Sequence, residues 1–143
     1  MKRKLILCAS MAVFIVGLIG CTGKITYKEA SIEYSIDTFT DTNSISDEVE
    51  VTKGGTVTVT LGSNRTTGFQ WSEQAQIANA TILEQTGHKF IEPQTSDAGA
   101  AAKEEWTFKA LKTGTTSVTM EYSRPEGGEK GIWKFQLTVT VIP

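Results

Sequence analysis

The sequence predicts an all-β domain, an immunoglobulin-like antiparallel β-sandwich of about seven to nine strands. Apolar and polar residues alternate with a period of two through most of residues 49–141, which is typical of strands with one buried and one solvated face. Glycine-containing turn signals separate these runs, and no segment shows a long apolar period of 3.6 residues. A small β-barrel is the alternative architecture.

Six runs show the alternation most clearly and predict the main strands. They contain Val49–Val51, Val57–Leu61, Phe69–Trp71, Trp106–Ala110, Val118–Tyr122 and Trp133–Val141. Weaker strands are predicted at Ser31–Ile36, Thr81–Leu83 and His88–Glu92, and the polar stretch Thr38–Glu48 predicts a solvated loop. Turns are predicted at residues 53–55, 86–87, 112–115 and 126–128.

The composition fits one globular domain. Of 143 residues, 39% are hydrophobic and 21% are charged, and the formal net charge is −2. These values exclude a collagen, a disulfide scaffold, a multispan membrane protein and a highly charged disordered chain. The chain has no basic excess to replace phosphate counterions, which argues against a nucleic-acid partner.

Residues 1–20 have the order of a secretory signal. The basic Lys2-Arg3-Lys4 precedes the uncharged run Leu5–Ile19, which is shorter than the roughly 20 apolar residues of a transmembrane helix. Leu18-Ile19-Gly20-Cys21 then resembles the lipobox of bacterial lipoproteins, in which the cysteine is lipidated and becomes the first mature residue.

The lipobox resemblance implies an order of segments along the chain. Residues 1–20 would be removed as a lipoprotein signal peptide, residues 21–29 would comprise the lipidated Cys21 and a tether, and residues 30–143 would form the sandwich domain. The protein would be exported and held on the membrane of the bacterial cell envelope by its lipid. A plain signal peptide with an incidental cysteine is the alternative.

Few residues suited to catalysis or metal binding remain. Cys8 lies in the signal and Cys21 would carry lipid, which excludes a catalytic cysteine, a cysteine-ligated zinc and a disulfide. His88 is the only histidine, and in a strand such a residue is more often partly exposed than a ligand or a base. The carboxylates match neither a calcium loop nor a glycosidase pair. The sequence therefore predicts a binding module with no catalytic residue, cofactor or metal, and not an enzyme.

Three loops are candidate binding segments, because the sheets of a sandwich hold the loops at its ends in place. Gly62–Trp71 is polar and contains Gly68, which permits a positive φ. Thr95–Lys103 has small side chains that let a partner approach, and Tyr122–Gly131 is stiffened by Pro125. Their simpler interpretations are a polar hairpin, a flexible surface loop and a long hairpin connection.

The first loop resembles that of the chagasin-like family of cysteine protease inhibitors, whose fold is an immunoglobulin-like sandwich. The family's loop reads Asn-Pro-Thr-Thr-Gly-aromatic. Here Arg65 replaces the proline, and all the other positions match: Asn64, Thr66, Thr67, Gly68 and Phe69.

The other two loops carry the resemblance further. The family's second loop reads Gly-x-Gly-Gly before a strand with Trp, Thr and Phe; Gly99 and residues 106–108 match, while Ala101 and Ala102 replace two glycines. Its third loop begins Arg-Pro-aromatic; residues 124–125 match, while Glu126 replaces the aromatic residue.

The resemblance implies a reversible, tight-binding inhibitor of papain-like (clan CA) cysteine proteases. Thr66-Thr67-Gly68 would enter the catalytic cleft, and Gly99–Lys103 and Arg124–Gly128 would hold the cleft on either side. A glycine turn pinned between strands would not present a scissile bond to the thiolate. The residues implied to contact the protease are Asn64, Arg65, Thr66, Thr67, Gly68, Phe69, Gly99, Ala100, Ala101, Ala102, Arg124, Pro125 and Glu126.

The departures from the family pattern set two further expectations. Aromatic residues dominate binding hot spots, so Glu126 in place of the aromatic residue implies weaker inhibition, or inhibition of fewer proteases, than a full-motif member of the family would give. The chain is expected to act as a monomer. The altered second and third loops also motivate an alternative function, that of a structural or adhesive envelope lipoprotein that binds another protein or a glycan through its immunoglobulin-like domain.

Overall fold

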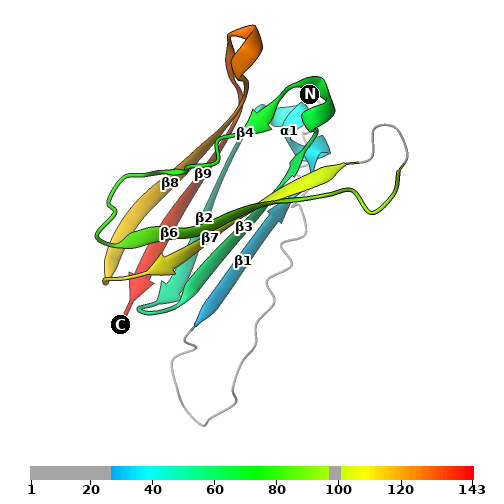
Figure 1. Cartoon of the computed structure of the whole chain (residues 1–143). Coiled ribbons are helices and arrows are strands. Elements are labelled where there is room, and N and C mark those ends of the chain that lie inside the picture. The colour runs from blue at the N-terminus through cyan, green and yellow to red at the C-terminus, as the bar shows by residue number, and fades with distance from the viewer. Residues whose placement is uncertain (1–26, 97–100) are drawn as a thin grey trace, which may run out of the picture.

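The computed structural model describes residues 27–96 and 101–143, in which nine strands form two sheets packed face to face (Figure 1). One sheet has the strand order β1-β3-β7-β6, and the other has the order β2-β9-β8-β4, with β5 also paired to β8. The first sheet contains β1 (Glu29–Tyr34), β3 (Thr56–Ser63), β6 (Leu83–Ile91) and β7 (Ala102–Ala110). The second contains β2 (Ser44–Thr52), β4 (Gln70–Trp71), β5 (Gln76–Ile77), β8 (Gly114–Arg124) and β9 (Glu129–Ile142).

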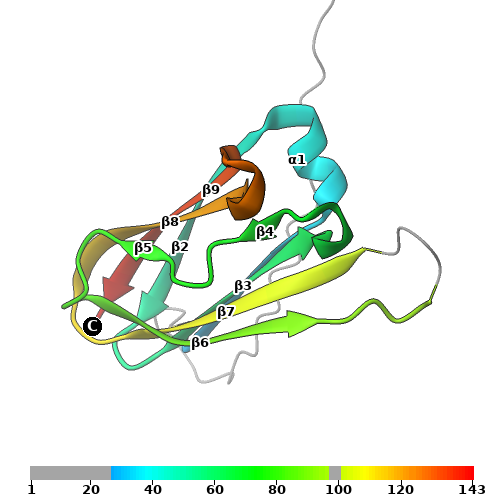
Figure 2. The same cartoon turned by 45° about the horizontal axis from the view of Figure 1, so that its top comes forward.

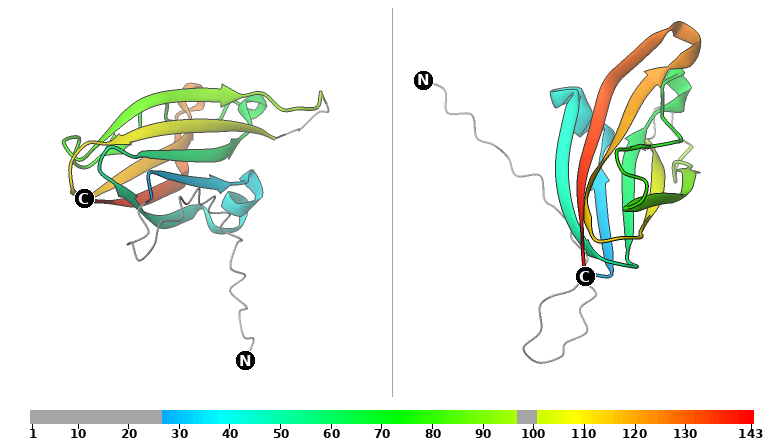
Figure 3. Two further views of the ribbon diagram at one scale, coloured as in Figure 1. Left: turned by 90° about the horizontal axis from the view of Figure 1, so that it is seen from below. Right: turned by 90° about the vertical axis from the view of Figure 1, so that its left-hand side faces the viewer.

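The predicted β-sandwich is confirmed, but two of its strand pairings are parallel. β1 runs parallel to β3, and β2 runs parallel to β9, whereas we expected antiparallel neighbours throughout. Parallel neighbours need a long connection. β1 passes into β2 through the helix α1, so that each of these strands joins the edge of a different sheet (Figure 3).

The predicted solvated loop at Thr38–Glu48 is wrong. The chain forms α1 (Ile36–Thr42) and then begins β2 at Ser44. Phe39 is fully buried against Trp71, with ring centroids 4.9 Å apart, and Asn43 ends the helix with a φ of 58°. A single aromatic anchor holds this short helix, and one anchor leaves no apolar period in the sequence.

β6 is one continuous strand where two weak strands were predicted. The expected turn at residues 86–87 is a β-bulge, a shift in the pairing with β7 between Gln85 and Gly87. A bulge absorbs one extra residue and bends the strand without ending it.

The core lies between the sheets and is rich in aromatic side chains. Trp71 and Trp106 meet edge to face with centroids 6.4 Å apart, and the partly buried Trp133 stacks on Tyr122 at the margin of the core. Burial of such rings stabilises the fold by about 25 cal/mol for each Å² of apolar surface. The largest fully buried side chains include Trp71, Trp106, Tyr122, Phe39, Phe108 and Phe135.

The two ends of the sandwich differ in content (Figure 2). One end holds α1, the β3–β4 connection, the end of β6, the start of β7 and the tip of the β8–β9 hairpin. The other holds the C-terminus and Tyr27, whose carbonyl oxygen accepts a hydrogen bond of 2.8 Å from the Thr52 amide. Within the part of the chain that the structure describes, no helix is long and apolar enough to span a bilayer.

Candidate functional site

The first loop crosses from one sheet to the other and is not a hairpin. It leaves β3, forms the 3₁₀ turn η1 (Arg65–Thr67) and enters β4 of the opposite sheet. Gly68 ends η1 with a φ of 80°, which confirms the predicted left-handed glycine. Both sheets therefore fix the ends of this loop.

Short hydrogen bonds close the η1 turn. The side chain of Asn64 accepts hydrogen bonds from the amide and the hydroxyl of Thr66. The Thr67 hydroxyl donates to the Asn64 carbonyl at 2.7 Å, and the Gly68 amide donates to the Arg65 carbonyl at 3.0 Å. The Thr67 hydroxyl thus bonds the backbone, whereas the Thr66 hydroxyl bonds the side chain of Asn64. Thr66, Thr67 and Gly68 are exposed, so this closed turn presents a defined shape to solvent.

A buried carboxylate lies beneath the turn. Glu104 of β7 has no exposed surface, and its Oε1 accepts hydrogen bonds from the Ser63 hydroxyl at 2.8 Å and the Trp71 amide at 3.4 Å. Its Oε2 lies 2.9 Å from Nε2 of His88 and 3.3 Å from Nη2 of Arg65. Ser63 and Trp71 lie on opposite sides of the loop, so that one carboxylate ties both of its ends together.

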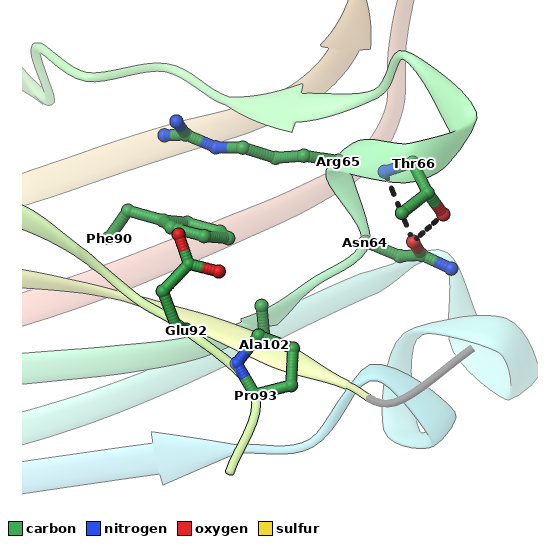
Figure 4. A pocket seen from close by; sticks show the side chains of 7 residues that line it. All are labelled: Asn64, Arg65, Thr66, Phe90, Glu92, Pro93 and Ala102. Carbon is green, nitrogen blue, oxygen red and sulfur yellow. Dashed lines mark hydrogen bonds between the residues drawn. The ribbon is translucent and has the colours of Figure 1, made fainter. Parts of the chain in front are cut away.

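Arg65 turns its side chain away from the tip of the loop and along β6. Its Cζ lies 4.2 Å from the centroid of the Phe90 ring, which is the geometry of a cation–π contact. Beside it lies a hollow of about 440 Å³, lined by Asn64, Arg65, Thr66, Phe90, Glu92, Pro93 and Ala102 (Figure 4). The hollow separates the first loop from the ends of β6 and β7.

The third loop packs against the first. β8 ends at Arg124, and η2 (Pro125–Gly127) forms the tip of the β8–β9 hairpin. The Arg124 guanidinium lies 5.4 Å from the centroid of Phe69. The structure therefore brings the Arg-Pro motif beside the aromatic residue that closes the first loop.

Tyr122 joins the two loops from below. Its hydroxyl accepts a hydrogen bond of 3.0 Å from the Asn64 amide and donates one of 3.3 Å to the Asn64 carbonyl. Its ring stacks on Phe69 with centroids 5.7 Å apart. Burial is the main cause that raises the pKa of the Tyr122 phenol, which keeps the hydroxyl protonated and able to donate.

The second loop is described only in part. Gly99 and Ala100 lie outside the described residues, and Ala101 is exposed. Ala102 is 4% exposed, begins β7 and pairs with Ser63. Its methyl group lines the hollow beside Arg65, so Ala102 forms part of the floor between the first and second loops.

The titratable groups at this end are arranged to bind one another. His88 is a partly exposed strand residue of β6, as expected, with 14% of its side chain exposed, and it contacts Glu104. Among residues 27–96 and 101–143, no cluster of three or more histidine, cysteine or acidic side chains could hold a metal ion.

Sequence reasoning missed the residues that support the loops, namely Glu104, Ser63, Phe90 and Tyr122. One signal for Glu104 existed. It stands two residues before Trp106 in the alternation of β7, at a position whose side chain must point into the core. A carboxylate at such a position requires partners from neighbouring strands.

The chain was compared with protein-family models, curated proteins and solved structures. The family model described as "Chagasin family peptidase inhibitor I42" matches residues 50–141, a span that contains all three loops, and confirms the resemblance found in the sequence. No curated protein matches the chain by sequence.

Solved structures share the fold. The cysteine protease inhibitor EhICP2 from Entamoeba histolytica is 20% identical, with a TM-score of 0.61 over 80% of this chain and 97% of its own. PbICP-C, solved in complex with falcipain-2, is 16% identical, with a TM-score of 0.59 over 78% of this chain and 98% of its own. Amebosin is 21% identical, with a TM-score of 0.50 over 69% of this chain and 96% of its own.

Proposed function

Since the chain belongs to the chagasin family of peptidase inhibitors, we propose that it inhibits papain-like cysteine proteases reversibly, by placing the loops around η1 in the active-site cleft. The observation that carries the proposal is the fixation of the exposed η1 turn from both sheets. Glu104 binds the flanks of the loop at Ser63 and Trp71, and Tyr122 binds its first residue, Asn64. A loop ordered before binding loses little conformational entropy when it docks.

The same geometry supports resistance to cleavage. A protease holds a scissile peptide extended across its nucleophile, with reacting atoms roughly 3–3.5 Å apart. The η1 turn is closed by the bond from the Gly68 amide to the Arg65 carbonyl, and Gly68 holds a left-handed conformation. Opening it would break the contacts that fix both ends, so the turn would occupy the cleft without presenting an extended bond.

The proposed contact surface has a centre and two flanks. Its centre is the exposed tip Thr66-Thr67-Gly68, with Asn64 and Phe69 bordering it. The resemblance would place the second loop (Gly99, Ala100, Ala101 and Ala102, the first two outside the described residues) on one flank and Arg124, Pro125 and Glu126 on the other. The supported turn and the Arg-Pro motif beside Phe69 favour this arrangement. Arg65 belongs to the surface through its backbone.

We also propose that lipid on Cys21 anchors the domain to the envelope membrane with its loops facing outward. Tyr27, the first described residue, lies at the end of the sandwich opposite η1, next to Thr52. Five residues separate Cys21 from Tyr27, and the six steps along the chain between them span at most about 20 Å. A lipid so close to the far end would hold the membrane away from the protease-binding loops.

A titration of papain tests the proposed function. The full chain, kept in solution by a mild detergent, should abolish papain activity stoichiometrically, and activity should return on dilution. Trypsin, a serine protease, serves as the control and should keep its activity. Failure to inhibit any papain-like enzyme at micromolar protein would overturn the proposal. Capture of a different envelope protein or a glycan by the same chain would then favour the adhesive lipoprotein.

A further inference from the structure

We propose that Arg65 is a positioning residue, whose side chain holds the η1 turn in its docking conformation and does not itself recognise the protease. The inference rests on the proposed inhibition, because docking is the property that the positioning serves. Arg65 is the first residue of the η1 turn. A side chain at this position can point either toward a partner or back toward the fold.

The Arg65 side chain is held at two points within the fold. Its Nη2 lies 3.3 Å from Oε2 of Glu104. Its Cζ lies 4.2 Å from the centroid of the Phe90 ring, and Figure 4 shows the two side chains together. The carboxylate restrains the guanidinium in its plane, and the ring restrains it from one face. Two restraints from different strands, β7 and β6, fix the direction of the whole side chain.

The partner of Arg65 cannot move to follow it. Glu104 has no exposed surface, and the same carboxylate is bound by Ser63 at 2.8 Å and by His88 at 2.9 Å. An exposed ion pair loses much of its effect to solvent and to the entropy of two mobile side chains. Here the arginine side chain is 36% exposed, but the carboxylate is buried and already held by other partners, so only the arginine side chain has to be ordered to form the pair.

The anchor acts directly on the closure of the turn. The carbonyl of Arg65 accepts the hydrogen bond from the Gly68 amide that completes η1. Release of the Arg65 side chain would free this carbonyl to rotate and would loosen the tip at Thr66 and Thr67. The chain would then spend part of its time in conformations that do not fit a cleft. The apparent affinity for the protease would fall in proportion to the fraction of the chain that stays in the docking conformation.

The test compares three variants of the full chain in mild detergent. Arg65→Ala removes the anchor. Arg65→Pro also removes it but restrains φ near −65°, as the first position of a turn requires. The ψ of 85° at Asn64 is clear of the α region that a following proline disfavours. Lys89→Ala removes an equal charge from the exposed pair with Glu105 and serves as the matched control.

Two readouts decide the outcome. In the free chain, hydrogen exchange at the Gly68 amide should accelerate at least about tenfold in Arg65→Ala and stay near the parent rate in Arg65→Pro and Lys89→Ala. With papain, Arg65→Ala should lower the association rate constant about tenfold and change the dissociation rate constant less than about twofold. Arg65→Pro should recover most of the association rate.

The opposite pattern would overturn the inference. If Gly68 exchange is unchanged in Arg65→Ala, the side chain does not order the turn. If dissociation accelerates while association is unchanged, and proline does not rescue, Arg65 is a contact residue. Absence of inhibition by the parent chain would instead refute the proposed function, and the exchange experiment would still decide whether Arg65 orders the turn.

Discussion

The hydroxyl of Ser63 lies 2.8 Å from the carboxylate of Glu104, and neither residue is exposed to solvent. The first prediction follows from this pair. Glu104→Ala should lower the free energy of unfolding by about 3 kcal/mol, because it leaves buried donors without their acceptor. Urea unfolding followed by tryptophan fluorescence measures this loss.

Glu105→Ala is the matched control for Glu104→Ala. Glu105 is the next residue of β7, but its carboxylate pairs with the exposed Lys89 at 3.0 Å. Removal of such a pair should cost less than about 1 kcal/mol. Equal losses for the two substitutions would show that Glu104 contributes no more than a surface carboxylate.

A second prediction compares two glycines that end 3₁₀ turns. Gly68 and Gly128 have φ values of 80° and 72°, so alanine at either position should cost roughly 1–2 kcal/mol of backbone strain. A Cβ on Gly68 would also lie 3.1 Å from Cδ of Arg124, whereas one on Gly128 would meet nothing within 4 Å. Gly68→Ala should therefore lower the midpoint of thermal unfolding more than Gly128→Ala. Equal shifts would show that Arg124 moves aside at no cost.

The main strands and the glycine turn of the first loop could be predicted because each depends on residues that are neighbours in the sequence. Alternation in Val57–Leu61 and Trp133–Val141 places one face in the core. Gly68 is likewise a local signal, since a left-handed residue at the end of a turn favours glycine. The structure brings the loop motif and the Arg-Pro pair together at one end of the molecule, where Arg124 lies beside Phe69.

The features that the sequence did not predict depend on contacts between distant residues. Phe39 holds α1 only because Trp71, from another strand, provides its pocket. The parallel register of β1 with β3 arises from the crossing of the chain between sheets. The alternation of β7 places Glu104 on the buried face, but its partners Ser63 and His88 come from other strands and cannot be read from the local sequence.

A third prediction concerns alkaline pH. The Tyr34 hydroxyl of β1 donates a hydrogen bond of 2.8 Å to Asp47 of β2, across the two sheets. Burial, together with the hydrogen bond and negative charge of Asp47, raises the pKa of Tyr34 to about 12 from its ordinary 10.0. Between these values the unfolded chain has lost the proton that the folded chain retains. The free energy of unfolding should therefore fall as pH rises through this interval.

Tyr34→Phe isolates this contribution from the other groups that titrate at high pH. The difference in free energy of unfolding between parent and variant should be constant below pH 10 and shrink as pH approaches 12. Asp47→Asn, which keeps an acceptor without the charge, should give a smaller dependence. A difference that does not vary with pH would refute the proposed linkage.

A fourth prediction tests the tip of the first loop. Thr67 is exposed, and its hydroxyl donates to the Asn64 carbonyl at 2.7 Å. Thr67→Asp replaces this donor with a carboxylate that repels the carbonyl and that docking would strip of water. The variant should bind papain less tightly by about 2 kcal/mol, roughly a 30-fold rise in the inhibition constant. Gly68→Val should weaken binding by at least about the same amount.

Controls separate an effect on docking from an effect on charge or folding. Thr115→Asp adds the same charge on β8 near the opposite end of the sandwich, where Thr115 is exposed beside Thr140, and it should leave the inhibition constant within about twofold. Thr67→Ser keeps the hydroxyl and should inhibit like the parent. If a folded Thr67→Asp variant, with the unfolding midpoint of the parent, inhibits as well as the parent does, then the tip of η1 does not enter the cleft.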